Sequence, residues 1–237
     1  MIPELVTVHT SLLTDLGDAV RAKTGGSEEM TLDEMASAVA NIPSGGLPSG
    51  YTQIDYLESD GTQYIDTGVV ISADSSDRCV QYEATVFYKT VAANYMGATG
   101  NFMFGATATN KWYICATNSS FASTTNKWYD ISLSMVKGAN NGANGTGYTF
   151  VVNTGTTTYT LTGSFTSFTT GGTIMLFRYS TNTPISCRIA KFRIVIGAEC
   201  VRDFIPCIRN SDSVAGMYDI INGQFYTNAG SGTFITP

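Results

Sequence analysis

Few residues in this chain could perform acid–base or nucleophilic chemistry. Retaining hydrolysis of a glycosidic bond needs two carboxyl groups about 5 Å apart, and the alternate positions Glu58 and Asp60 would share one face of a strand. Both also lie beside a predicted turn, and we favour ordinary turn and surface roles for them. His9 is the only histidine, so a Ser-His-Asp or Cys-His site would find its base only in the N-terminal segment. The sequence therefore favours a protein that is not an enzyme.

The cysteines and aspartates offer little for metal binding. The cysteines show no Cys-x-x-Cys spacing, and a zinc site would need histidine partners. We expect reduced and mostly buried thiols at Cys79, Cys115, Cys187, Cys200 and Cys207. Asp66, Asp74 and Asp77 could contribute to a calcium site at the rim of a domain, because hard cations prefer several oxygen ligands. Solvated loop acids are the simpler interpretation, so calcium is the one cofactor that stays open.

Aromatic residues interleaved with asparagines form the densest group suited to binding a sugar. Sugar rings stack their C–H faces on aromatic planes, while side-chain amides bond to the hydroxyl groups. The candidate residues for this glycan site are Tyr95, Phe102, Trp112, Tyr113, Asn110 and Asn118. Several of these rings could instead belong to the core, because Trp112 and Ile114 alternate as buried neighbours on a strand do.

The composition argues against two classes of partner. The chain has 237 residues, of which 43% are hydrophobic and 14% charged, and its net charge is −6. A nucleic-acid binder needs a basic stripe, and the sequence has none. No apolar run approaches the roughly 20 residues that span a bilayer. The N-terminus does not read as a secretory signal, so we expect synthesis in a cytoplasm, no membrane insertion and no nucleic acid.

Two short amphipathic helices are predicted in the N-terminal segment. The apolar face of the first, within Ser11–Lys23, includes Leu12, Leu16 and Val20. The second begins with a capping-box pattern formed by Thr31 and Glu34, and its apolar face includes Leu32, Met35 and Val39. Helices this short are marginally stable alone, so we interpret them as an attachment or oligomerisation segment whose apolar faces need a partner.

A linker rich in Pro, Gly and Ser separates these helices from the rest of the chain. The sequence divides into a helical segment at 1–43, a linker at 44–50 and a β domain at 51–237. Beyond the linker the period of the apolar residues changes to two, which is typical of strands with one buried face.

Strand patterns recur throughout the β domain. Alternation of apolar and polar residues predicts strands within Cys79–Tyr88, Trp128–Val136 and Cys187–Ile196. The short apolar run Ile174–Tyr179 is suited to a central strand, and Asn222-Gly223 predicts a hairpin with a type I′ turn. Many short strands with no helix between them predict a mainly β fold, an antiparallel β-sandwich.

Both ends of the β domain resemble a known family. The segment 47–68 (LPSGYTQIDYLESDGTQYIDTG) resembles the opening strand of laminin-G-like, or concanavalin-A-like lectin, domains of phage and gut-bacterial surface proteins. The segments 201–207 (VRDFIPC), 216–219 (GMYD) and 225–228 (FYTN) resemble the closing hairpins of the same domains. The resemblance implies a jelly-roll β-sandwich with its two ends on neighbouring strands, often with a glycan-binding edge.

The helical segment is similar to attachment segments of tail- or baseplate-associated phage structural proteins, through Ala22–Gly25 and Thr31–Met35. This resemblance implies a virion protein that docks onto other virion proteins and, like phage fibres, forms a homotrimer. We expect a tail or head fibre that displays its sandwich for binding a host-surface polysaccharide or glycoprotein. Two alternatives stay open: a head fibre or capsid decoration that binds no sugar, and a divergent glycoside hydrolase.

Overall fold

A computed structural model of the protein describes residues 14, 17–18, 31, 34, 46–71, 79–90, 94–107, 110–115, 117–138, 146–166, 172–179, 182 and 184–237. The chain forms two compact units, Met1–Tyr51 and Thr52–Pro237, and each is described by itself.

The described part of the N-terminal unit contains the predicted capping box. The backbone N–H of Thr31 donates to Glu34 Oε2 at 2.7 Å, and the N–H of Glu34 donates to Thr31 Oγ1 at 3.3 Å. The reciprocal bonding predicted from the sequence is therefore confirmed. The predicted apolar faces lie outside the described residues: Leu12, Leu16, Val20, Leu32, Met35 and Val39. Among the residues that are described, no helix is long and apolar enough to cross a bilayer.

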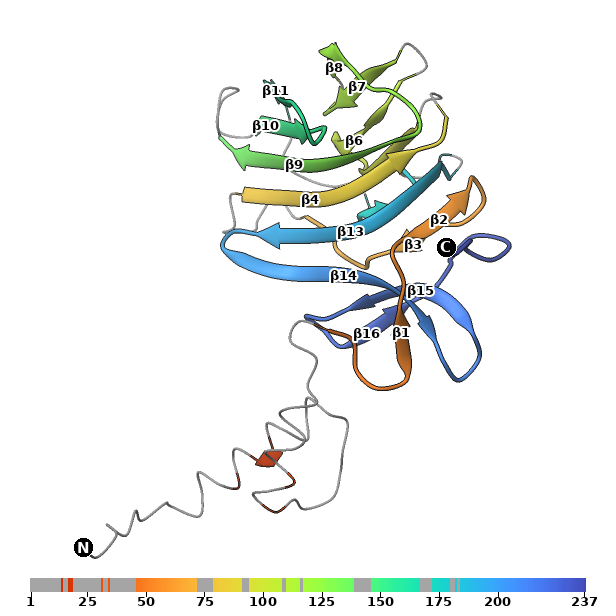
Figure 1. The fold of residues 1–237 in the computed structure, drawn as a ribbon. Coiled ribbons are helices and arrows are strands. Elements are labelled where there is room, and N and C mark those ends of the chain that lie inside the picture. Colours follow the sequence, from red (N-terminus) through yellow and green to blue (C-terminus); the bar gives the residue numbers. More distant parts are fainter. Residues whose placement is uncertain are drawn as a thin grey trace, which may run out of the picture. The chain divides into compact units, whose positions relative to one another are not determined.

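The second unit is mainly β, and its strands form two antiparallel sheets (Figure 1). The larger, sheet A, has the order β11-β10-β9-β4-β13-β14-β15-β16, with β1 paired to β14 and β2 to β13. Its strands are β1 (Tyr51–Gln53), β2 (Leu57–Asp60), β4 (Cys79–Tyr88), β9 (Lys127–Lys137), β10 (Thr146–Asn153), β11 (Thr158–Phe165), β13 (Ser186–Ile196), β14 (Glu199–Arg209), β15 (Val214–Asp219) and β16 (Gln224–Tyr226).

The smaller sheet, sheet B, has the order β3-β12-β5-β6-β7-β8. Its strands are β3 (Ile65–Asp66), β5 (Asn94–Ala98), β6 (Phe102–Ala106), β7 (Lys111–Ile114), β8 (Thr117–Ala122) and β12 (Met175–Leu176). In Figure 1, β9, β4, β13 and β14 form a curved layer with sheet B behind it.

The long strands agree with the alternation in the sequence. The predicted strand Cys79–Tyr88 is β4, and the other two alternating segments lie within β9 and β13, so these predictions are confirmed. Of the predicted strand Ile174–Tyr179, only Met175–Leu176 has strand geometry. Phe177 follows with a φ of 62°, a left-handed conformation that interrupts an extended chain.

The predicted hairpin at Asn222-Gly223 is confirmed, but its turn differs from the prediction. Asp219 pairs with Gln224, which leaves Ile220–Gly223 as the loop. Within that loop only Gly223 has a positive φ, 69°, whereas a type I′ turn needs positive φ at both central residues. The Asp219 side chain explains the difference, because its Oδ1 accepts the N–H of Ile221 at 3.1 Å and thereby holds the loop in a wider form.

The core between the sheets is dominated by aromatic side chains. Trp112 of β7 is fully buried and contacts three rings of sheet A, those of Tyr88, Tyr129 and Phe150, at centroid distances of 5.7, 5.0 and 5.4 Å. Tyr82 of β4 contacts Phe104 of β6 at 6.4 Å. The two sheets therefore pack face to face, and each buries one of its faces in this core.

The two ends of the second unit lie side by side. Glu58 of β2 and Ile235 exchange two backbone hydrogen bonds of 2.9 Å each. The Gln63 side chain donates from Nε2 to the carbonyl of Thr233 at 2.9 Å. Figure 1 accordingly places the C-terminus beside β2 and β3. Backbone pairing thus links the two ends of the second unit.

A substitution at one glycine would test this architecture directly. Gly97 of β5 has a φ of +124°, and a Cβ at this position would lie 2.1 Å from the carbonyl oxygen of Phe102 on β6. We predict that Gly97→Ala lowers the free energy of unfolding by about 2–3 kcal/mol, measured by urea denaturation. Gly172→Ala is the control, because nothing lies within 4 Å of its Cβ position, and it should change stability by less than about 0.5 kcal/mol. Equal effects of the two substitutions would contradict the β5–β6 geometry.

Candidate ligand-binding face

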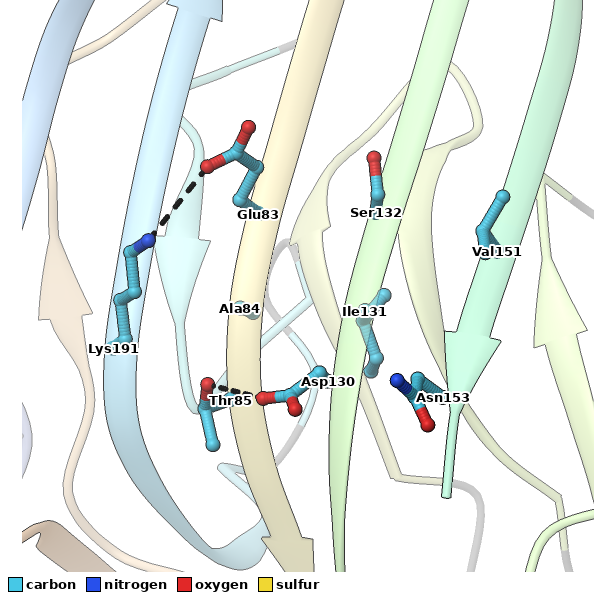
Figure 2. Close-up of a pocket in the computed structure, with 9 residues that line it drawn as sticks. All are labelled: Glu83, Ala84, Thr85, Asp130, Ile131, Ser132, Val151, Asn153 and Lys191. Atoms are coloured by element: carbon cyan, nitrogen blue, oxygen red, sulfur yellow. Dashed lines mark hydrogen bonds and ion pairs between the residues drawn. The ribbon is translucent and has the colours of Figure 1, made fainter. Parts of the chain in front are cut away.

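The outer face of sheet A has a shallow groove of about 330 Å³ over β4, β9, β10 and β13 (Figure 2). Cross-strand register assembles it, because Glu83 pairs with Ser132 and Thr85 with Asp130. Alternate residues of each strand face outward, so polar positions scattered along the sequence line one surface. The lining residues are Glu83, Ala84, Thr85, Asp130, Ile131, Ser132, Val151, Asn153 and Lys191.

The polar side chains of the groove are oriented by one another. The Thr85 hydroxyl donates to Asp130 Oδ1 at 2.7 Å, and Lys191 Nζ lies 3.8 Å from Glu83 Oε2. Figure 2 shows these two pairs on neighbouring strands, with Asn153 beyond Asp130. The groove therefore offers carboxylates as acceptors, an ammonium as donor and an amide that does both.

An aromatic platform continues the groove along the same face. Phe87 and Trp128 occupy the next outward positions of β4 and β9, pair in register, and have ring centroids 5.3 Å apart. Trp128 is 37% exposed although it is a large apolar residue. Tyr56 joins it at 6.0 Å, and the Arg188 guanidinium lies 4.5 Å from the centre of the Tyr56 ring. This arrangement leaves an indole open to a ligand beside hydrogen-bonding groups.

A buried ion pair holds Arg188 in place. Glu58 is 3% exposed, and its carboxylate accepts from Arg188 Nε and Lys89 Nζ, each at 2.5 Å. Burial by itself raises the pKa of Glu58, but the bonds and charges of Lys89 and Arg188 outweigh burial and lower that pKa. The register Glu58–Arg188–Phe87–Trp128 across β2, β13, β4 and β9 then joins this pair to the platform.

The surface role predicted for Glu58 is therefore wrong, whereas the turn role of Asp60 is confirmed. The Asp60 carboxylate accepts the N–H of Thr62 at 3.1 Å and its hydroxyl at 2.7 Å. Glu58 is buried instead, because β2 lies between β13, with which it pairs, and the segment around Ile235. Since the two carboxylates have separate structural partners, Glu58 and Asp60 do not form a free acid–base pair.

The aromatic group predicted from the sequence is divided between the core and the surface. Phe102 and Trp112 are fully buried, so their rings cannot stack on a sugar, and their assignment to the glycan site was wrong. Their strands bury these positions against sheet A. Asn110 lies exposed at a turn with a φ of 58°.

The other predicted residues meet on the outer face of sheet B. Tyr95 and Tyr113 flank Gly105 in register, with ring centroids 4.8 Å apart, and Asn118 pairs with Tyr113 on the next strand. Burial, followed by the nearby Tyr113 phenol, raises the pKa of Tyr95. These three residues form a row of half-buried rings and one exposed amide, which is a second candidate for contact with a sugar.

The metal candidates do not assemble in the described structure. Asp66 is exposed, and its Oδ1 accepts the N–H of Gly68 at 2.9 Å, while Asp74 and Asp77 lie outside the described residues. No group of three or more His, Cys, Asp or Glu that could hold a metal occurs among the residues described. All five cysteines are free and three are buried, as predicted. Burial raises the pKa of the Cys207 thiol to about 12, which keeps it protonated.

The groove and its platform are the features that sequence reasoning missed. Their signal was present as Glu83, Thr85 and Phe87 on one strand and Trp128 and Asp130 on another, all at outward positions. Alternation shows that such residues face away from the core. It does not show that β4 and β9 are neighbours, and so the two sets could not be joined into one surface.

The buried carboxylate generates a pH-dependent prediction. Because the folded-state pKa of Glu58 is lowered, its contribution to stability is present above the unfolded value of about 4.3 and is lost as the pH falls through the folded value. Glu58→Gln should lower the free energy of unfolding by about 2–3 kcal/mol at pH 7, and the deficit should shrink below about pH 4. Urea denaturation between pH 7 and pH 3 measures both effects.

The control is Glu199→Gln, which changes an exposed carboxylate on β14. It should shift stability by less than about 0.5 kcal/mol at either pH. A deficit for Glu58→Gln that stays constant across the pH range would show that the lost interaction does not depend on the carboxylate charge.

No relative guides the interpretation of this face. Neither a protein-family model, nor a curated protein, nor a solved structure matches the chain. The features that bear on function are therefore the groove and its platform, together with the resemblance of both ends of the β domain to a known family.

Proposed function

We propose that this protein is a phage virion structural protein whose β domain binds a host-surface glycan in the groove of sheet A. The observation that supports this most is the exposed Trp128 ring at the end of a groove lined by carboxylates, hydroxyls and an amide. A sugar presents an apolar C–H face and a rim of hydroxyls, each both donor and acceptor. A ligand of this kind uses an aromatic plane and mixed polar groups at once.

The direction of the groove agrees with a chain of sugar rings. Trp128 and Asp130 are alternate residues of one strand, as are Phe87 and Thr85 of its neighbour, so platform and polar groups follow each other along the strands. One ring on Trp128 would place the next ring beside Asp130 and Asn153. Glu83 and Lys191 lie further along the same face.

We also propose that the two sheets form a jelly roll of the concanavalin-A type. The pairing of β1 with β14 and of Glu58 with Ile235 supports it, since the resemblance implies chain ends on neighbouring strands. The N-terminal helices would dock the protein onto other virion proteins. The capping box at Thr31 and Glu34 supports a helix start at this place.

Glycan binding to the groove is testable with single substitutions. Screening against host-envelope polysaccharides should find a ligand that Trp128→Ala and Asp130→Asn each bind about tenfold more weakly or worse, because each removes about 1.4 kcal/mol of contact. Isothermal titration measures the affinities. Tyr113→Ala on sheet B is the matched control and should bind as the wild type does.

Other results of these binding experiments would indicate a different site or a different function. Loss of binding in Tyr113→Ala but not in Trp128→Ala would move the site to the row on sheet B. A protein that binds none of the host polysaccharides would support a decoration role instead. Release of reducing ends from the ligand would support the hydrolase alternative.

Docking through the helical segment predicts a separate phenotype. A chain that lacks residues 1–46 should keep its β-rich circular dichroism spectrum and its affinity for the glycan, because the groove lies wholly within the second unit. It should be missing from purified virions, as judged by immunoblotting of the particles. Incorporation at the level of the full-length chain would contradict a docking role for this segment.

A further inference from the structure

The two ends of sheet A differ in a way that points to an interface. One end is β16, which has 3 residues, and the other is β11, which has 8. Sheet B likewise ends in β3 with 2 residues and β8 with 6. Short edge strands are one of the devices that prevent edge-to-edge association. That device protects β16 and β3 but not β11 and β8.

The long edges lie together on one flank of the domain. Phe121 of β8 stacks on Tyr159 of β11 with ring centroids 4.9 Å apart and an angle of 13° between the planes. Tyr159 is 39% exposed. Figure 1 shows β11 and β8 at the same end of the two sheets. We call the surface formed by Thr117–Ala122 and Thr158–Phe165 the open flank.

The described residues of the open flank also lack charges and proline, and β11 lacks a bulge, although all three features protect the edges of other sheets. Residues 138–177, which contain β11, include no Asp, Glu, Lys, Arg, His or Pro. β8 contains none of these residues either. β11 pairs with β10 over its full length with no bulge, and no described strand pairs with its other side. Its exposed residues are largely threonine, which favours strand pairing. A chain with 32 formal charges (13 + 19) thus leaves this edge without any.

We propose that, in place of the homotrimer that the resemblance implies, β11 of a second copy of this chain pairs antiparallel with β11 across a two-fold axis, so that sheet A continues from one protomer into the other. An uncharged edge best matches a partner edge that is also uncharged, because a charged side chain placed against it would lose water and gain no counter-charge. The same edge of another copy meets this requirement. A two-fold interface needs only one self-complementary surface.

Pairing of the β11 edges would also place two grooves on one face, and this consequence rests on the proposed function. Antiparallel strands related by a two-fold axis perpendicular to the sheet present the same face to the same side. Val151 and Asn153 of the groove belong to β10, the strand next to this edge. The dimer would therefore present two grooves on one continuous face, which favours multivalent binding to a dense glycan surface.

The test adds like charges to the edge of the full-length chain. Thr160 and Thr162 are exposed neighbours on one face of β11, and lysine is the residue that natural edges use to block pairing. The double variant Thr160→Lys/Thr162→Lys should have half the wild-type mass by light scattering coupled to size exclusion. The double variant Thr160→Glu/Thr162→Glu should behave in the same way, and an equimolar mixture of the two should recover the wild-type mass.

Two controls separate pairing from folding and from glycan binding. Val136→Lys/Thr149→Lys adds the same charge to exposed positions of the interior strands β9 and β10, and it should keep the wild-type mass. Circular dichroism should be the same for all variants. Affinity for a soluble single-site glycan should be equal in dimer and edge variant, whereas retention on a densely coated surface should fall at least tenfold in the edge variant.

The mass measurements test the pairing of the β11 edges without any glycan. A wild-type chain with the mass of the edge variants, or a mixture that stays at half mass, would overturn it. If no glycan ligand exists, the mass results still stand, so failure of the proposed function and failure of edge pairing are distinguishable.

Discussion

The packing of Trp112 between the two sheets is the constraint on which the other features of the domain depend. Its ring contacts Tyr88, Tyr129 and Phe150 on three adjacent strands of sheet A, β4, β9 and β10. Because side chains alternate between faces, a slip of one residue in any of these strands would turn its buried set outward. The core therefore sets the register of β4 against β9, and with it the row of Phe87 and Trp128 on the opposite face.

A second constraint on the domain is the buried charge of Glu58. A carboxylate that is 3% exposed is costly to bury unless it is paired, and its two partners come from β13 and from the segment after β4. The backbone of Glu58 also pairs with Ile235 near the C-terminus. One residue thus connects the start, middle and end of the second unit. This arrangement also orders Arg188, whose guanidinium lies over Tyr56 and Phe87.

The groove, the platform and the β11 edge suggest that different parts of sheet A have different functions. The centre of sheet A is polar and aromatic on its outer face, and its β11 edge is uncharged and unprotected. Under our proposals the centre contacts sugar and the edge contacts a second copy, while β14, towards the other end of the sheet, pairs with β1 near the start of the second unit. Such a surface would gain affinity from repeated weak contacts more than from any single tight one.

Local patterns in the sequence determined the features that depend on neighbouring residues. Alternation located β4, β9 and β13, the capping box appeared at Thr31 and Glu34, and Asn222-Gly223 marked the last hairpin. The loop of that hairpin was predicted incorrectly, because Asp219 accepts a bond from Ile221 that turn propensity does not include.

Only the tertiary structure decided which outward residues meet. Phe87 and Trp128 are far apart in the chain, and Glu58 finds Arg188 only through the pairing of β2 with β13. Phe102 and Trp112 could not be told from surface aromatics, since a ring next to asparagines has the same local pattern whether its strand faces sheet A or solvent. The physical reason is that alternation defines two faces of a strand, whereas strand order and register, set by the packed core, define which faces become a site.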